Sequence, residues 1–147
     1  AFSGTNIMIR QMTLQDIERV GQLWLEASLI AHDFISADFW HSNLITMTQE
    51  LLPQSESYVH ITDENPDAFI TLENDFIHCL FVEPKMQRHG IGSLLLSYAK
   101  SSHETLRLNV YQQNPSAGKF YESQGFVICG EAICPYTGCA EFEYEWR

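Results

Sequence analysis

The segment 87–92 carries residue types and a spacing suited to binding a phosphate. It reads Gln-Arg-His-Gly-Ile-Gly and lies between the expected end of a strand and the start of an apolar-periodic helix. Glycines at 90 and 92 let the backbone approach a ligand, and the N–H groups of residues 89–93 lie at the positive end of the helix dipole. A dinucleotide fingerprint would need glycine at Leu95, and a P-loop would need Gly-Lys-Ser/Thr, so both are excluded. An ordinary glycine-bearing turn is the alternative.

A second motif lies at residues 114–126. It reads Asn-Pro-Ser-Ala-Gly-Lys-Phe-Tyr, and Gly-Phe follows at 125–126. Asn as an N-cap followed by proline is typical of a helix start, so we expect a helix from about residue 115 that ends at the glycine. A strand that contains Leu-Phe-Val-Glu-Pro at 80–84 precedes the first motif.

These three segments resemble the GNAT superfamily of N-acyltransferases. The family's phosphate loop reads Gln/Arg-x-x-Gly-x-Gly/Ala, and its later motif reads Asn-x-x-Ala-x-x-Phe-Tyr-x-x-x-Gly-Phe, in the order found in this chain. The resemblance covers about residues 7–146 and is closest to the small stand-alone bacterial members. It implies acetyl-CoA as co-substrate and direct transfer of the acetyl group to a primary amine. The amine would belong to a small molecule, a peptide N-terminus or a protein lysine. We expect no metal, because the cysteines lack the spacing of a metal site.

The resemblance and the order of elements predict an α+β fold. We expect a GNAT-like mixed central sheet of about seven strands flanked by about four helices, in the order β-α-α-β-β-β-α-β-α-β-β. Turn residues between the three central strands favour an antiparallel meander. The resemblance implies that the fourth and fifth strands splay apart and leave a slot for the thioester. The strands are expected at 7–11, 58–62, 68–73, 76–82, 105–110, 126–133 and 140–146, and the helices at about 14–27, 37–52, 91–100 and 115–124.

The resemblance also implies how the cofactor binds. Its pyrophosphate would lie on the N–H groups of residues 88–93, with Arg88 and the Ser93 hydroxyl as extra contacts. Its pantetheine arm would pair like an extra strand with the exposed backbone of Phe81 and Val82. The cofactor-binding residues implied in this way are Leu80, Phe81, Val82, Gln87, Arg88, His89, Gly90, Ile91, Gly92, Ser93, Asn114 and Tyr121.

Tyr121 is the residue to which the resemblance assigns the chemistry. The family carries a tyrosine at this position that protonates the departing CoA thiolate as a general acid. The alternative is an aromatic side chain that packs behind Phe120. Asn109 lies on a central strand, where a polar side chain needs a partner; it orients the thioester or the acceptor, or it bonds to neighbouring backbone. Asn114 is first a helix cap and second a pantetheine contact.

The sequence offers more than one candidate for the general base that deprotonates the acceptor amine. Family members often carry Glu at the position where this chain has Phe76. His32 and His78 are the candidate bases, because an ordinary His pKa of about 6.5 suits proton transfer near neutral pH. Each is otherwise a structural or surface histidine. Strand alternation places His78 on the same face as Phe76, and we expect His32 between the first two helices, at the acceptor wall.

The charge of the chain restricts its partners. The formal net charge is −11, from 19 Asp and Glu against 8 Lys and Arg. The excess lies in residues 20–84, which carry 11 carboxylates and no Lys or Arg. Such a surface repels phosphate backbones, so nucleic acid and anionic membranes are excluded as partners, and a tRNA acceptor is disfavoured. We expect a cationic, amine-bearing acceptor that faces this segment.

The rest of the sequence bears on setting and assembly. The four cysteines have neither disulfide nor metal spacing, which favours a reduced, cytoplasmic protein. We expect residues 1–7 to be a cloning remnant or disordered leader and residues 8–147 to form a single N-acetyltransferase domain. A homodimer through the last strands is compatible with the fold. The alternative function is a CoA-binding regulatory or interaction module without catalysis, and Phe76 in place of Glu is the observation in its favour.

Overall fold

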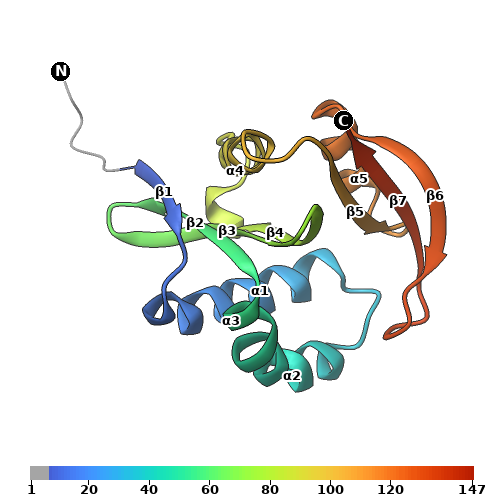
Figure 1. The fold of residues 1–147 in the computed structure, drawn as a ribbon. Helices are drawn as coiled ribbons and strands as arrows, with labels where there is room; N and C mark the ends of the chain where they lie inside the picture. The colour runs from blue at the N-terminus through green and yellow to red at the C-terminus, as the bar shows by residue number, and fades with distance from the viewer. Residues whose placement is uncertain (1–6) are drawn as a thin grey trace.

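A computed structural model describes residues 7–147 of the chain. These residues form seven strands and five helices that are joined by loops and short turns (Figure 1). The predicted order of elements and the mixed sheet are confirmed. The expected leader lies outside the described residues except for Ile7, the first residue of β1. No helix within residues 7–147 is long and apolar enough to cross a membrane. The strands are β1 (Ile7–Gln11), β2 (Glu56–Thr62), β3 (Asn65–Glu73), β4 (Phe76–Val82), β5 (Leu106–Tyr111), β6 (Val127–Ile133) and β7 (Ala140–Trp146), and the helices are α1 (Ile17–Ala31), α2 (Ala37–Thr46), α3 (Leu52–Gln54), α4 (Ile91–Lys100) and α5 (Pro115–Ser123).

The strand order in the sheet is β1-β2-β3-β4-β5-β7-β6. Strands β1 to β4 pair antiparallel, which confirms the predicted meander. Strands β4 and β5 run parallel and share a single register pair, Phe76 with Arg107, beside which the Arg107 N–H donates to the Asp75 carbonyl at 2.8 Å. Beyond this pair the two strands separate, as the splay between the fourth and fifth strands requires.

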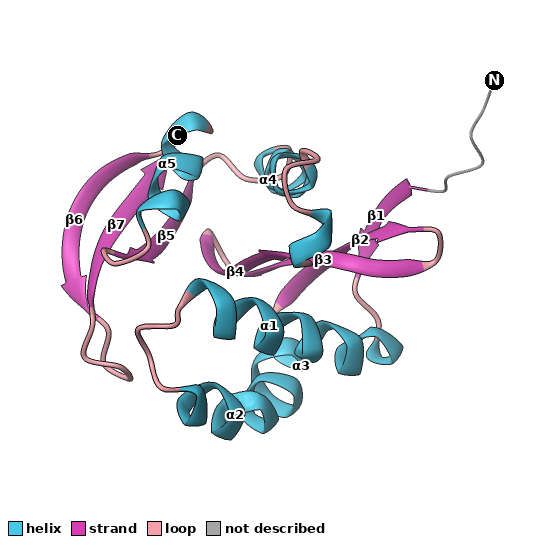
Figure 2. Cartoon of the chain, turned by 180° about the vertical axis from the view of Figure 1, so that it is seen from behind, coloured by secondary structure: helices cyan, strands magenta, loops and turns pink. Residues whose placement is uncertain are grey.

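Helices cover both faces of the sheet and close two apolar cores (Figure 2). Helices α1, α2 and α3 lie on one face, where Val20 and Leu23 of α1 pack with Phe69 of β3. On the other face, Leu95 and Leu96 of α4 are fully buried in the second core. Strand residues therefore alternate between two buried environments.

A bulge at His78 breaks that alternation in β4. Thr71 pairs with Cys79 and Leu72 pairs with Ile77, so His78 has no partner of its own on β3. Without the bulge, residues 77 and 79 would share a face; with it, Ile77 enters the core under α4 and Cys79 enters the core under α1. Bulges of this kind increase the local twist of the strand that carries them.

Two helices differ from the expectation. The first continues four residues past Ala27, to Ala31. The second was expected as one helix over 37–52, but α2 ends at Thr46 and residues 47–51 form a wider, π-type turn before α3. The Thr48 hydroxyl donates back to the Leu44 carbonyl at 3.1 Å, and Pro53 has no N–H to continue the ladder. Both effects disturb the regular i to i−4 hydrogen bonds of a helix, and the wider turn over residues 47–51 forms where the two effects combine.

Candidate active site

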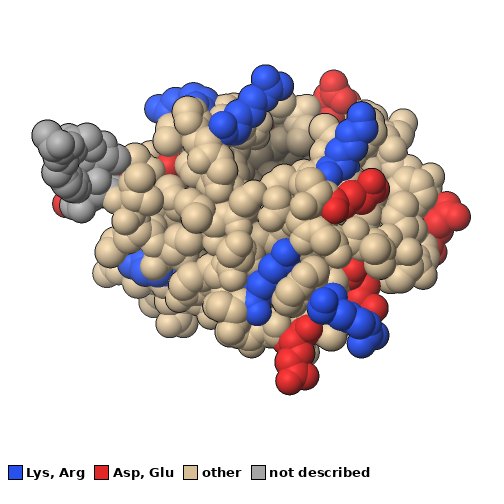
Figure 3. All heavy atoms as spheres, turned by 90° about the horizontal axis from the view of Figure 1, so that it is seen from above, with Lys and Arg blue, Asp and Glu red and all other residues tan. Residues whose placement is uncertain are grey.

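A cavity of about 770 Å³ occupies the gap between β4 and β5 and reaches the helices on both sides. Its walls come from α1, α2, β4, the loop before α4, the first turn of α4, β5, α5 and β7. Viewed from the side of α4, the surface is hollowed, and Lys or Arg side chains flank the hollow (Figure 3). Every predicted site residue lines this cavity except His89, which is exposed. The sequence motifs and the three candidate residues His32, His78 and Asn109 therefore meet at one place.

The first turn of α4 opens toward this cavity. No side chain caps the helix, so the N–H groups of residues 91–93 have no partner within the described residues. Gly90 has a φ of 79°, and Arg88 also lies in the left-handed region with a φ of 68°. A side chain at Gly92 would place its Cβ 3.3 Å from Cζ of Phe120, so this glycine lets α4 and α5 approach closely. Free N–H groups at a helix start suit a phosphate.

Two polar side chains of the phosphate loop already hold protein partners. Ser93 Oγ accepts a hydrogen bond from Gln124 Nε2 at 3.0 Å and keeps its own proton to donate. Gln87 Nε2 donates to the Val82 carbonyl at 3.1 Å. Val82 is one of the backbone positions expected to pair with pantetheine, and its carbonyl is occupied by the Gln87 side chain in this structure. Leu80 and Phe81 line the cavity along the separated part of β4.

Tyr121 is buried in α5 at 9% exposure and lines the cavity. Its ring lies among those of Phe120, Phe126 and Tyr144, at centroid distances of 5.1, 5.5 and 6.5 Å. No described residue hydrogen-bonds to its hydroxyl. Burial raises the pKa of this phenol, and nearby Cys79 raises it further, so the hydroxyl is protonated at neutral pH. The Tyr121 ring therefore packs against its aromatic neighbours, while its hydroxyl has no hydrogen-bond partner among the described residues.

Asn114 joins α5 to His32. Its Oδ1 accepts from the Ala117 N–H at 3.4 Å and from the Ser116 hydroxyl at 3.2 Å, as expected for an N-cap. This fixes the amide so that Nδ2 faces His32 Nε2 at 3.4 Å. Because an amide nitrogen only donates, His32 Nε2 accepts and the ring proton lies on Nδ1. That Nδ1 is buried without a partner among the described residues.

His32 stands in an aromatic surrounding at the end of α1. The rings of Phe34, Trp40, Phe81 and Tyr111 lie between 5.0 and 6.1 Å from its own. Burial lowers its pKa to about 4, so the imidazole is neutral at pH 7. In this arrangement His32 offers a hydrogen-bond donor at Nδ1, while its lone pair is engaged by the asparagine amide.

His78 lies at the β4 bulge and contacts two neighbours. Its Nε2 lies 3.1 Å from Glu73 Oε1, and its ring lies 5.0 Å from that of Phe76, in keeping with the predicted common face. The carboxylate that would orient this histidine sits in the β3–β4 hairpin and is largely exposed, with 70% of its side chain accessible. Phe76 itself does not line the cavity.

Sequence reasoning missed Glu141 of β7. It is the only Asp or Glu among the described residues that line the cavity. Asn109 Nδ2 donates to Glu141 Oε1 at 3.4 Å, so a side chain, not backbone, is the partner of that asparagine. Burial raises the pKa of Glu141, the hydrogen bond from Asn109 lowers it by less, and the neighbouring charge of Glu143 raises it, so the net shift is upward. Alternation in Ala-Glu-Phe-Glu-Tyr-Glu-Trp signals a polar face, but only the pairing of β7 with β5 places it here.

Three buried polar groups in the cavity wall lack partners among the described residues. They are Ser28 Oγ, His32 Nδ1 and Trp40 Nε1, on α1, at its end and on α2. Ser28 is fully buried and Trp40 is 6% exposed. Buried polar groups without a hydrogen bond are costly, so their concentration in one wall points to a ligand or ordered water that pairs with them.

The charge of this wall differs from the expectation. None of the 11 carboxylates of residues 20–84 lines the cavity, although that segment supplies α1, α2 and β4. The segment contributes aromatic and small side chains instead, because the helix faces that close the cavity are apolar and their carboxylates point outward. Within the described residues, no three His, Cys, Asp or Glu side chains gather as a metal site would require.

Comparison with known proteins agrees with this geometry. Residues 27–147 match the family described as acetyltransferase (GNAT) domain. Peptidyl-lysine N-acetyltransferase YiaC of Escherichia coli (strain K12) is 34% identical over 122 residues, which are 82% of this chain and 84% of that protein. Peptidyl-lysine N-acetyltransferase YjaB of Salmonella typhimurium is 29% identical over 86% of this chain and 87% of that protein.

Solved structures share the fold at lower identity. The solution structure of apo-form YjaB from Escherichia coli has a TM-score of 0.85 at 24% identity and covers 96% of this chain and 97% of that one. The PaiA N-acetyltransferase of Thermoplasma acidophilum, solved in complex with coenzyme A, has a TM-score of 0.82 at 20% identity, over 97% of this chain and 99% of that one. The resemblance inferred from the two motifs is thus confirmed, and the chain belongs to the GNAT acetyltransferase family.

Proposed function

We propose that this acetyltransferase moves the acetyl group of acetyl-CoA directly to the side-chain amine of a lysine in a peptide or protein. The observation that carries the proposal is the cavity between β4 and β5, whose lining includes both the uncapped start of α4 and Tyr121. Two relatives of the chain are named peptidyl-lysine N-acetyltransferases, which supports lysine over other primary amines.

The residues present fit acetyl-CoA. The N–H groups of residues 91–93 and the Arg88 side chain would hold the pyrophosphate, because both offer positive charge or free donors to an anion. The separated edge of β4 at Phe81 and Val82 offers backbone groups for the pantetheine amides. Once bound, acetyl-CoA supplies an activated acetyl thioester.

Tyr121 would act as the general acid. Its hydroxyl stays protonated at neutral pH and has no partner among the described residues, and the residue lines the cavity. A phenol in that position can give its proton to the thiolate that departs when the amine attacks. Backbone N–H groups of β4 near Leu80 and Phe81 would stabilise the negative charge on the thioester oxygen.

Transfer without an acyl-enzyme is favoured by the state of Cys79. This thiol also lines the cavity, but burial raises its pKa to about 12. A thiol is a poor nucleophile unless it is ionised, so Cys79 would not accept the acetyl group at neutral pH.

A module that binds CoA without catalysis is the second candidate function. Phe76, where family members often carry Glu, favours it, whereas the free hydroxyl of Tyr121 favours catalysis. Two peptides separate the candidates and also test the acceptor: one with a blocked N-terminus and one free lysine, the other with a free N-terminus and an acetylated lysine.

We expect acetyl-CoA binding by calorimetry and thiol release with the first peptide only. Release with the second peptide only would move the assignment to N-terminal amines. Binding of acetyl-CoA without thiol release from either peptide would favour the binding module.

A further inference from the structure

Glu141 stands out because the cavity contains one carboxylate from the described residues and the mechanism above lacks a proton acceptor. A lysine side chain is an ammonium ion at neutral pH and cannot attack a thioester until it loses a proton. Neither histidine suits the role of proton acceptor, because His32 carries its ring proton on the free nitrogen and the Nε2 of His78 is engaged by Glu73. The missing group must reach the same cavity as Tyr121.

We propose that the Glu141 carboxylate, held by Asn109, binds the acceptor ammonium and accepts its proton. The proposal rests on the N-acetyltransferase function proposed above. Glu141 lines the cavity from β7, and Asn109 lines it from β5, with 3.4 Å between the amide nitrogen and the carboxylate oxygen. Two unpartnered polar side chains that are more than nine-tenths buried, Ser28 and Trp40, line the same cavity and point independently to a ligand there.

The surroundings of Glu141 prepare it for this step. Tyr111 is its partner across β5 and Ala132 its partner across β6, so the carboxylate stands on the sheet with an aromatic ring beside it. Its charged neighbours are all acidic. Glu143 lies two residues along β7, and Glu131 accepts a hydrogen bond from the Gln112 amide that also reaches the Glu141 carbonyl. With no cation beside it among the described residues, an incoming ammonium is the partner that this carboxylate lacks.

The proton balance of the proposed reaction closes. The ammonium gives one proton to Glu141, and the neutral amine forms the C–N bond with the acetyl carbon. The C–S bond then breaks, and the sulfur takes a proton from Tyr121. The nitrogen loses its second proton as the amide forms, which restores the phenol through solvent, while Glu141 returns its proton to solvent. One acetyl group is transferred and one proton is released overall.

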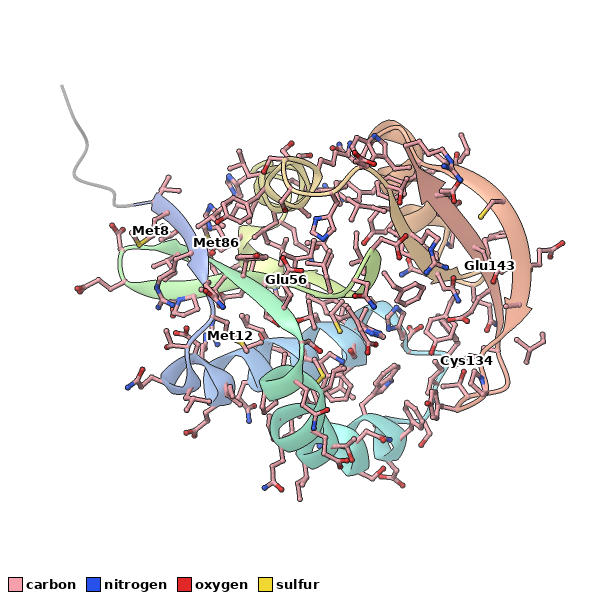
Figure 4. The ribbon with its side chains drawn as sticks, viewed as in Figure 1. Met8, Met12, Glu56, Met86, Cys134 and Glu143 are labelled. Carbon is pink, nitrogen blue, oxygen red and sulfur yellow. The ribbon has the colours of Figure 1, made fainter. Side chains whose placement is uncertain are left out.

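Glu141→Gln tests the proposal, and Glu143→Gln is the matched control. Both variants remove one negative charge from the same face of β7. Of the two residues, only Glu141 lines the cavity; Glu143 is labelled on β7 in Figure 4. We expect Glu141→Gln to lower kcat/KM for the lysine peptide about 100-fold or more, the scale of a general base. The acetyl-CoA Kd should stay at the wild-type value, and Glu143→Gln should stay within about twofold of the wild type.

The pH profile adds a readout that a structural role would not change. The acidic limb of kcat/KM should lie above the ordinary Glu pKa in the wild type, should move to lower pH in Glu143→Gln because the charge of Glu143 raises the pKa of Glu141, and should vanish in Glu141→Gln. If Glu141→Gln does not fold, Glu141→Asp carries the test. Glu141→Asp keeps the carboxylate charge, so the acidic limb should persist. Its shorter side chain should raise KM for the peptide about tenfold. Wild-type kinetic constants in this variant would overturn the proposal.

The outcomes separate this proposal from the function on which it rests. A wild-type protein without amine-dependent thiol release would remove the proposed function itself. An active wild type with equal rates in Glu141→Gln and Glu143→Gln would overturn the role of Glu141 alone. Loss of the acidic limb in His78→Gln, with the limb retained in Glu141→Gln, would assign the proton acceptor to His78 instead.

Discussion

Tyr121 and Tyr144 are two buried tyrosines whose hydroxyls have opposite surroundings. The Tyr121 hydroxyl has no partner among the described residues and belongs to a residue of the cavity wall. The Tyr144 hydroxyl donates to Glu122 Oε2 at 2.8 Å, and Tyr144 does not line the cavity. Replacing each by phenylalanine removes one oxygen atom and nothing else. We expect Tyr121→Phe to lose activity and keep stability, and Tyr144→Phe to lose stability and keep activity.

The magnitudes follow from these contacts. A hydrogen bond to a charged group contributes roughly 1.5–3 kcal/mol, and exposure of Glu122 reduces this to about 1 kcal/mol. For a chain of this length, about 1 kcal/mol lowers the melting temperature by roughly 2–4 °C. Tyr121→Phe breaks no hydrogen bond within the described residues, so its melting temperature should equal or exceed that of the wild type. Loss of a general acid should lower kcat about 10²- to 10⁴-fold.

Thermal melts and thiol release at saturating acetyl-CoA measure both effects on the same preparations. Calorimetry with acetyl-CoA serves as the control, because Tyr121→Phe should bind with nearly the wild-type Kd. An unchanged kcat across pH in Tyr121→Phe would refute the role of Tyr121 as the acid. A similar fall of kcat in Tyr144→Phe would show that ring packing around α5, and not the free hydroxyl, controls the rate.

Three further outcomes are expected. Gly92→Val should weaken acetyl-CoA binding at least tenfold, measured by calorimetry, since a Cβ there lies 3.3 Å from the Phe120 ring and larger groups must push it into the cavity; a wild-type Kd would contradict this. Asp16→Asn should destabilise the fold by about 1–3 kcal/mol at pH 7, because Asp16 pairs with Arg10 at 2.7 Å. The pKa of Asp16 is lowered by that hydrogen bond, so its contribution is present above about pH 4 and is lost as pH falls; chemical denaturation should show the two proteins converge in acid. KM for a lysine peptide should rise as salt rises from about 0.05 to 0.5 M, whereas an insensitive KM would show that the net charge of −11 does not act on the acceptor.

Local signals in the sequence were sufficient to place the starts of α4 and α5, which border the cavity. The glycine loop and the Asn-Pro start of α5 each depend on residues within one turn of a helix, and both elements begin where expected. Turn residues between β2, β3 and β4 likewise indicated the meander. Short-range rules of capping and turn chemistry act within a few residues, so a single sequence reveals them.

Other features of the cavity depend on contacts that no local pattern reveals. Strand β7 inserts between β5 and β6, and only this long-range pairing brings Glu141 beside Asn109. The bulge at His78 changes which face Cys79 occupies, a shift that strict alternation cannot anticipate. The carboxylates of residues 20–84 illustrate the same limit. Their number can be counted from the sequence, but their absence from the cavity follows from how α1 and α2 pack.

Stoichiometric acetyl transfer to lysine tests the central claim most directly. Wild-type protein, acetyl-CoA and a lysine peptide with a blocked N-terminus would be incubated, and thiol release and peptide mass would be followed together. The predicted result is one acetyl group on the lysine Nε for each thiol released, at a rate that depends on the peptide. Tight binding of acetyl-CoA with no acetylated peptide, or thiol release that does not depend on the peptide, would contradict the proposed function.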